Sequence, residues 1–169
     1  SPLIKIENLN VDFPLGRALF GKPPMLRAVN DVSIEIMPHK FFGLVGESGS
    51  GKTTLGRAIL RAAPITSGKI NFDNGKDRYD IEEMTKPQLK EYRKQAQLIF
   101  QDPYAALSPR MTVRDIIAEP LEVMELTQTR EETDQRVREI ASKCRLNLEH
   151  LRRFPHAFSG GQRQRISIA

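Results

Sequence analysis

The fold of this chain is most constrained by one eight-residue stretch, Gly46-Glu47-Ser48-Gly49-Ser50-Gly51-Lys52-Thr53. A glycine, four further residues, a second glycine and then Lys-Thr make the pattern of a phosphate-binding loop. Glycines let the backbone bend tightly, so that successive N–H groups point inward and form a concave anion site. Lys52 adds a mobile positive charge for the β- and γ-phosphates, and the Thr53 hydroxyl is suited to coordinate Mg²⁺. The stretch therefore predicts a nucleotide phosphate site.

The segments on either side of this loop give it a definite structural setting. Residues 41–45, Phe-Phe-Gly-Leu-Val, form a short apolar run typical of a buried parallel strand. Residues 53–60 indicate a helix. Strand, loop and helix in this order place the phosphates at a helix N-terminus, where the helix dipole favours anions. The alternative is a flexible glycine loop that binds nothing, and the complete pattern with both flanks disfavours it.

A second phosphate signal lies near the end of the chain, where Phe158 is followed by Ser-Gly-Gly-Gln at residues 159–162. Ser159 is a good helix N-cap, and Gln162 follows at the spacing of a capping box. Two glycines in the first turn would weaken an ordinary helix, but they leave N–H groups accessible to a phosphate. An ordinary capped junction is the alternative, and the loop upstream favours the phosphate interpretation.

Together these motifs resemble those of the ATP-binding subunits of ABC transporters. Residues 46–53 are similar to the Walker A loop of that family, and residues 159–162 are similar to its signature motif, with Phe158 where Leu is more usual. Gln101, which follows an apolar run, resembles the Q-loop glutamine. Phe13 aligns with the aromatic residue that stacks on adenine, although Tyr is commoner there.

A more specific resemblance points to the peptide and oligopeptide importer branch. It is carried by residues 101–113, which read Gln-Asp-Pro-Tyr-Ala-Ala-Leu-Ser-Pro-Arg-Met-Thr-Val, and by Phe-Pro-His-Ala at residues 154–157. The resemblance covers essentially the whole chain. It implies an α/β fold of the P-loop NTPase type, with an N-terminal antiparallel β subdomain and a helical subdomain.

The resemblance also assigns roles to individual residues. It implies ATP and Mg²⁺ as cofactors, with Thr53 and Gln101 near the metal and Gln101 near the attacking water. The signature would contact the γ-phosphate bound by an opposing ATP-binding subunit, and the segment after Gln101 would meet transmembrane permease subunits. The implied nucleotide-binding residues are Phe13, Gly46, Glu47, Ser48, Gly49, Ser50, Gly51, Lys52, Thr53, Thr54, Ser159, Gly160, Gly161 and Gln162.

Some parts of the family pattern are not found in these residues. In the family, an apolar strand ending in Asp-Glu and then a switch histidine follow the signature helix, whereas this chain stops at Ala169. His39, His150 and His156 all precede the signature. We therefore expect an incomplete parallel sheet, and a chain that does not hydrolyse ATP by itself.

Periodicity and capping signals predict the organisation of the chain. Residues 1–101 are expected to form the nucleotide-binding core with its β subdomain, and residues 102–169 a helical subdomain. Expected strands cover residues 3–9, 29–36 and 69–73, and two further segments, 41–45 and 97–100, are expected in the parallel sheet. Helix N-caps are predicted at Thr85, Thr112, Thr129 and Ser159.

Composition restricts the remaining classes of function. Twenty-six Lys and Arg residues against 21 Asp and Glu give a formal net charge of +5, but the two signs are interleaved, so nucleic acid is not an expected partner. No apolar stretch approaches the ~18 residues of a membrane span. We expect a cytoplasmic protein, peripheral on the membrane. The alternatives are a soluble ABC-type ATPase of DNA repair or translation, and a non-catalytic nucleotide-binding fragment.

Overall fold

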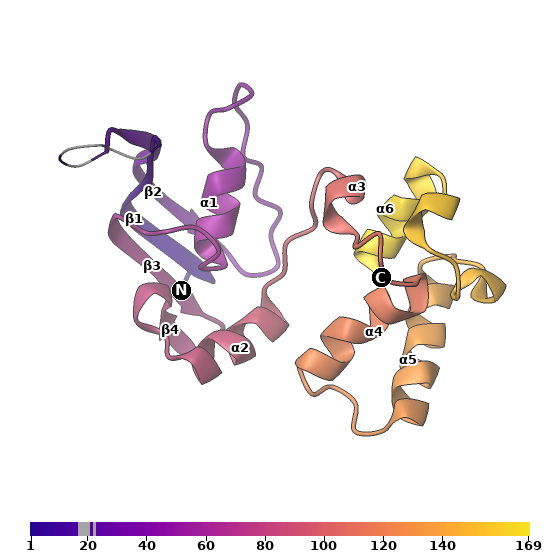
Figure 1. The fold of residues 1–169 in the computed structure, drawn as a ribbon. Coiled ribbons are helices and arrows are strands. Elements are labelled where there is room, and N and C mark those ends of the chain that lie inside the picture. The colour runs from indigo at the N-terminus through magenta and orange to yellow at the C-terminus, as the bar shows by residue number, and fades with distance from the viewer. Residues whose placement is uncertain (17–20, 22) are drawn as a thin grey trace. The chain divides into compact units, whose positions relative to one another are not determined.

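The computed structural model of the chain contains two compact units, Ser1–Leu98 and Ile99–Ala169 (Figure 1). It describes residues 1–16, 21 and 23–169, without the side chains of Pro103 and Tyr104. Strands occur in the first unit and helices dominate the second, so the chain has the mixed α/β character that its sequence predicts.

The first unit is built on an antiparallel sheet with strand order β2-β1-β3-β4. The strands are β1 (Ile4–Pro14), β2 (Met25–Ile36), β3 (Ser67–Asp73) and β4 (Arg78–Asp80). The three strands predicted from alternating apolar residues are therefore confirmed, although β1 and β2 are longer than expected. One face of this sheet supplies the core, with Ile6, Leu9, Val11, Ile70 and Phe72 buried.

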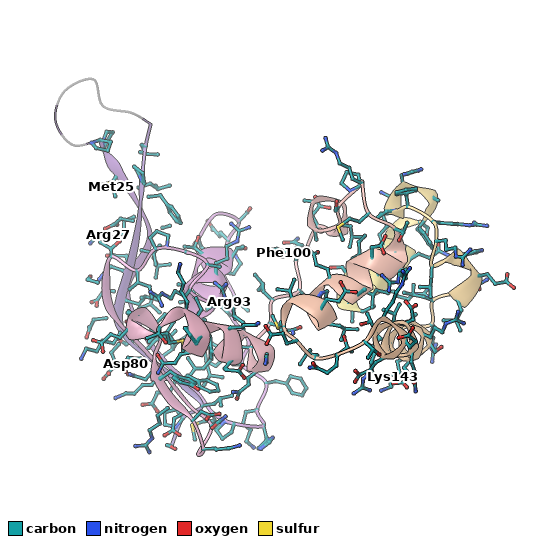
Figure 2. The ribbon with its side chains drawn as sticks, turned by 60° about the horizontal axis from the view of Figure 1, so that its bottom comes forward. Met25, Arg27, Asp80, Arg93, Phe100 and Lys143 are labelled. Carbon is teal, nitrogen blue, oxygen red and sulfur yellow. The ribbon has the colours of Figure 1, made fainter. Side chains whose placement is uncertain are left out.

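Two helices, α1 (Lys52–Ile59) and α2 (Lys86–Gln95), add to this core. A short 3₁₀ turn, η1 (Ile81–Glu83), precedes α2. Tyr92 is fully buried, and its ring meets that of Phe72 edge to face with 5.1 Å between the ring centroids. Its hydroxyl donates a hydrogen bond to the Ile59 carbonyl at 2.8 Å. Burial raises the pKa of Tyr92 to about 12. Arg93, labelled in Figure 2, donates to the carbonyls of Leu60 and Arg61 at the end of α1. These bonds fix the end of α1 to α2.

Two predicted strands, residues 41–45 and 97–100, are absent, so this part of the prediction is wrong. Both segments lack regular secondary structure, and the described residues contain no strand that pairs with either. Phe41 and Val45 expose 110% and 92% of their surface. A strand of a parallel sheet is stable when neighbours bond to its edges and helices cover its faces. Without such a neighbour, apolar composition does not produce a strand.

The second unit is helical. It contains α3 (Pro103–Ala106), α4 (Val113–Val123), α5 (Arg130–Lys143) and α6 (Gly160–Ile168), with short 3₁₀ turns η2 (Leu148–His150) and η3 (Pro155–Ala157). Helix α4 packs beside α5, and α3 beside α6 (Figure 1). Their shared core comprises Leu107, Val113, Ile117, Ala118, Leu121, Val137, Ala141, Leu146, Leu151, Phe158 and Ile166.

The predicted helix starts are confirmed throughout the chain. Thr85, Thr112, Thr129 and Ser159 each accept a hydrogen bond from the backbone N–H three residues later. Thr85 and Ser159 form complete capping boxes with glutamines at that position. The reciprocal bonds satisfy N–H groups that a helix start otherwise leaves without partners.

Candidate nucleotide-binding site

Helix α1 begins directly after the Walker A loop, as the sequence predicts. Its N-cap is Gly51, which has φ 90° and makes no capping bond through a side chain. No capping side chain therefore accepts a hydrogen bond from the first-turn N–H groups of α1, whereas one does so in α2, α4, α5 and α6. A helix start of this kind is a binding site for anions, because its amides and its dipole both favour negative charge.

Gly51 also sets the distance between the loop and the sheet. A Cβ atom at this position would lie 2.1 Å from the carbonyl oxygen of Ala28 on β2. No side chain fits there without displacing one backbone from the other. The glycine thus lets the loop, and with it the start of α1, rest against Ala28 of β2.

Lys52 closes the loop on itself. Its Nζ donates to the Gly46 carbonyl at 2.8 Å, the Glu47 carbonyl at 2.5 Å and the Ser50 hydroxyl at 3.2 Å. These bonds hold the ammonium group over the loop, where phosphates would meet it. The three N–H donors of the ammonium group are therefore all engaged within the loop.

A pocket of about 490 Å³ opens between the Walker A loop and β2. This volume lies within the usual range of roughly 300–1,000 Å³ for small-molecule sites. Its lining comprises Arg27, Ala28, Val29, Asn30, Val32, Leu44, Val45, Gly46, Gly49, Ser50, Gly51, Lys52 and Leu55. Five of the predicted nucleotide-binding residues are therefore brought together. Glu47, Ser48, Thr53 and Thr54 are not among the lining residues, and Thr53 is exposed in the first turn of α1.

Phe13 lies outside this lining. It pairs with Leu26 across β1 and β2 and packs partly buried against the core of the first unit. Its neighbour Asp12 pairs with Arg27, which does line the pocket. Phe13 is thus one strand position away from the pocket wall, and its predicted contact with adenine stays a prediction.

Arg27 is a pocket residue that sequence reasoning missed (Figure 2). Its Nε and Nη2 donate to the two carboxylate oxygens of Asp12 at 2.9 and 3.2 Å. Asp12 is almost fully buried, and the hydrogen bond from Arg27 lowers its pKa. The bidentate contact orients the guanidinium group and leaves Nη1 available to a ligand. Only the strand register could have revealed the pair, because the two residues are far apart in sequence.

The remaining predicted site residues belong to the second unit. Gln101 is exposed in a bend after the apolar segment. Ser159 accepts from the Gln162 N–H at 3.3 Å, and the Gln162 side chain accepts from the Ser159 N–H at 2.9 Å. Gly160 and Gly161 are exposed, with open space where a Cβ atom would lie. Their amides are therefore accessible from solvent, as a phosphate-contacting helix start requires.

The structure also shows what supports the signature helix. Arg163 Nε donates to the carbonyls of Pro155 and Phe158, both at 2.9 Å, and its Nη2 donates to the carbonyl of His156 at 3.2 Å. The guanidinium group thereby joins the first turn of α6 to η3. Sequence reasoning did not identify this support, because carbonyl acceptors leave no pattern in the sequence.

A resident metal would have few protein ligands here. In the described parts of the chain, no group of three or more His, Cys, Asp or Glu side chains is arranged to hold a metal ion. A hydroxyl group beside a phosphate loop is instead the usual protein ligand of a Mg²⁺ ion that arrives with its nucleotide. Thr53 has the chemistry for this role.

A phosphate-binding loop, a helix start without a side-chain cap and a glycine-rich second helix start are the features expected of a P-loop α/β protein. Comparison of the sequence with protein families shows that the ABC transporter family matches residues 29–169. The match includes the Walker A loop, Gln101 and the signature. The chain belongs to the ABC transporter family.

Several curated relatives match almost the whole chain. It is 49% identical to a dipeptide transport ATP-binding protein, DppF, of Lactococcus lactis, over 99% of this chain and 51% of that protein. An oligopeptide transport ATP-binding protein, OppF, of Bacillus subtilis is 46% identical over 99% of this chain and 52% of its own length. The chain thus spans about half the length of these relatives.

Solved structures agree on the fold. An ATP-binding cassette solved as a dimer, in a post-hydrolysis state bound to ADP and Pi, superposes with a TM-score of 0.78 at 24% identity. The superposition covers 98% of this chain and 67% of the other. The fold is therefore that of an ABC ATPase cassette, as the sequence predicts.

Proposed function

We propose that this chain binds ATP as part of the ATP-binding subunit of a peptide importer. The observation that carries the proposal is the helix start of α1, which has no side-chain cap and faces a pocket that Lys52 and three loop glycines line. The relatives reported above are named for dipeptide and oligopeptide transport. They favour a transporter over an ATPase of DNA repair or translation.

This arrangement suggests which residues hold each part of the nucleotide. The amides of residues 46–54 and Lys52 would hold the β- and γ-phosphates of ATP, and the Thr53 hydroxyl would hold Mg²⁺. Arg27 on β2 would donate to the nucleotide, and Phe13 on β1 would contact its base. Lys52 would then donate to phosphate oxygens in place of the loop carbonyls, because the charged phosphate oxygens are the stronger acceptors.

Hydrolysis is a function of the family, and we propose that this 169-residue chain does not perform it alone. Phosphoryl transfer depends on a positioned water and a carboxylate beside the metal, and Gln101 is a poor base. Steady-state phosphate release by the purified chain should stay at background, with the full-length protein as the positive control. Turnover that Lys52→Ala abolishes would contradict the proposal.

The segment after Gln101 is the proposed contact with a membrane subunit. Ala105 is exposed and Ser108 half-exposed, whereas Leu107 is buried in the core of the second unit. Leu107 therefore anchors the segment in the core of the second unit, whereas Ala105 and Ser108 remain accessible to a partner. Tyr104, also in this segment, lies outside the side chains that the structure describes. Among the described residues no helix has the length and apolar character to cross a bilayer. The contact with the membrane subunit would hold the protein at the cytoplasmic face of the membrane.

Crosslinking tests this contact. In full-length protein freed of other reactive cysteines, including Cys144, a cysteine at Ala105 or Ser108 should crosslink to the membrane subunit encoded beside this gene. A cysteine at Arg136, which is exposed on α5, is the matched control and should not react. Efficient crosslinking from the control position, with none from the other two, would refute the placement.

We also propose that two ATP-binding subunits pair head to tail. Each phosphate loop would enclose its own nucleotide, and the exposed Gly160 and Gly161 at the start of α6 would offer a second surface for phosphate. A two-fold arrangement lets the signature of one subunit contact the γ-phosphate on the other. The second subunit is either another copy or a related chain.

A further inference from the structure

The helical unit contains a charged pocket that is distinct from the Walker A loop, which belongs to the first unit. Its volume is about 290 Å³, and it lies among α4, α5 and the turn η2. Four arginines and two aspartates line it together with a hydroxyl group and three apolar side chains. The lining comprises Thr112, Arg114, Asp115, Arg130, Asp134, Val137, Arg138, Leu148, Leu151 and Arg152.

The two carboxylates in this pocket are already engaged. Arg114 donates through Nε and Nη2 to one oxygen of Asp134, at 2.8 and 2.6 Å, and through Nη1 to Asp115 at 3.1 Å. Asp115 also accepts from the Thr112 hydroxyl at 2.6 Å, and this bond lowers the pKa of Asp115. Arg114 thus bridges both aspartates, and with four arginines against two aspartates the lining keeps a formal charge of +2.

The other three arginines, Arg130, Arg138 and Arg152, make no recorded side-chain hydrogen bond or ion pair within the described part of the chain. All three are exposed around the same opening. Backbone bonds determine where one of them lies. The Arg114 N–H donates to the Leu151 carbonyl at 2.8 Å, which brings Arg152 to the start of α4.

The stability of the helices does not account for this concentration of charge. Arg130 is the first residue of α5, where the helix dipole opposes a positive side chain. Three like charges around one opening also repel one another. A bound anion would relieve both effects, because each guanidinium group would gain a charged acceptor.

We propose that this pocket binds a phosphate group, carried either by a small soluble anion or by a lipid headgroup. Three unpaired guanidinium groups match the several oxygens of a phosphate dianion, and Arg is the side chain best suited to such contacts. Leu148, which exposes 40% of its surface at this opening, offers an apolar contact to the part of the ligand that carries the phosphate. The proposal does not depend on ATP binding at the first unit.

Radiolabelled inorganic pyrophosphate is the first probe, and equilibrium dialysis the measurement. The full-length protein carries Lys52→Ala, so that the Walker A loop contributes little of the signal. Arg130→Gln, Arg138→Gln and Arg152→Gln should each weaken binding about tenfold, the loss of one charge-assisted hydrogen bond. The matched control is Arg136→Gln, an exposed arginine of α5 that pairs with Glu139 and does not line the pocket.

Vesicles provide the second arm and separate the two sources of phosphate. Cosedimentation is measured with phosphatidylcholine vesicles that contain phosphatidic acid, using the same variants. If the arginine variants weaken the binding of pyrophosphate but not of the vesicles, the ligand is a soluble anion. If they weaken the binding of the vesicles, the ligand is a lipid headgroup. The proposal is overturned if neither probe binds, or if the three pocket variants and Arg136→Gln behave alike with both probes.

Discussion

At the scale of single residues, Gly51 decides how closely the phosphate loop approaches the sheet. Gly51→Ala adds a methyl group 2.1 Å from the Ala28 carbonyl, at a φ that already disfavours side chains. Gly49→Ala is the matched control, because Gly49 also has a positive φ, 83°, but has open space around it.

The two glycine variants should therefore differ in stability. Gly49→Ala should lose ~1–2 kcal/mol of unfolding free energy, the cost of a left-handed alanine. Gly51→Ala should lose more, by a further ~1–3 kcal/mol, because two backbones must separate. Urea unfolding followed by circular dichroism measures both. Equal losses in the two variants would show that the contact between the loop and β2 does not contribute to the free energy of unfolding.

The ion pair between Asp12, which is buried, and Arg27, which is exposed, should make the stability of the fold depend on pH. Arg27 lowers the folded-state pKa of Asp12, so the stabilising contribution is complete above the unfolded pKa of about 3.9. It declines as the pH falls below that value and is lost once the pH has passed through the folded pKa. Urea unfolding of Asp12→Asn beside the unchanged protein should show a difference that narrows with acidification. A difference that is constant with pH would contradict this account.

At the scale of elements, the predicted helix starts form, whereas the two predicted parallel strands do not. Thr85, Thr112, Thr129 and Ser159 form local hydrogen bonds with residues three positions ahead, so their sequence spacing contains the whole interaction. A parallel strand takes its hydrogen bonds from distant segments. Residues 41–45 have the composition of such a strand and yet remain irregular and exposed.

The signature helix gives the element-scale test of head-to-tail pairing. In a full-length, hydrolysis-deficient protein, Ser159→Arg should leave ATP binding by the monomer intact and abolish ATP-induced dimerisation, because a bulky cation would fill the phosphate surface at the start of α6. Light scattering reports the mass of the particle. If Ser159 acted only as a cap, worth ~1 kcal/mol, the variant would still dimerise with ATP.

At the scale of the whole molecule, the class of protein and the loop side of the pocket could be predicted from the sequence. Five loop residues predicted from their spacing line one cavity beside β2, because a phosphate loop is a contiguous motif. Arg27 could not be found in this way, since its place depends on how β1 and β2 pair. The grouping of arginines in the helical unit could not be predicted from the sequence either, because these residues come from α4, α5 and the segment after η2.

Nucleotide binding by the Walker A loop is the central claim, and Lys52 tests it most directly. Titration of a fluorescent ATP analogue into full-length protein should show affinity roughly tenfold to a hundredfold weaker in Lys52→Ala, because charge-assisted bonds to the phosphates are lost. Lys40→Ala is the control, since Lys40 is exposed, lies shortly before the loop and does not line the pocket. Its affinity should equal that of the unchanged protein. Equal affinity in Lys52→Ala would contradict the assignment of the loop as the ATP site.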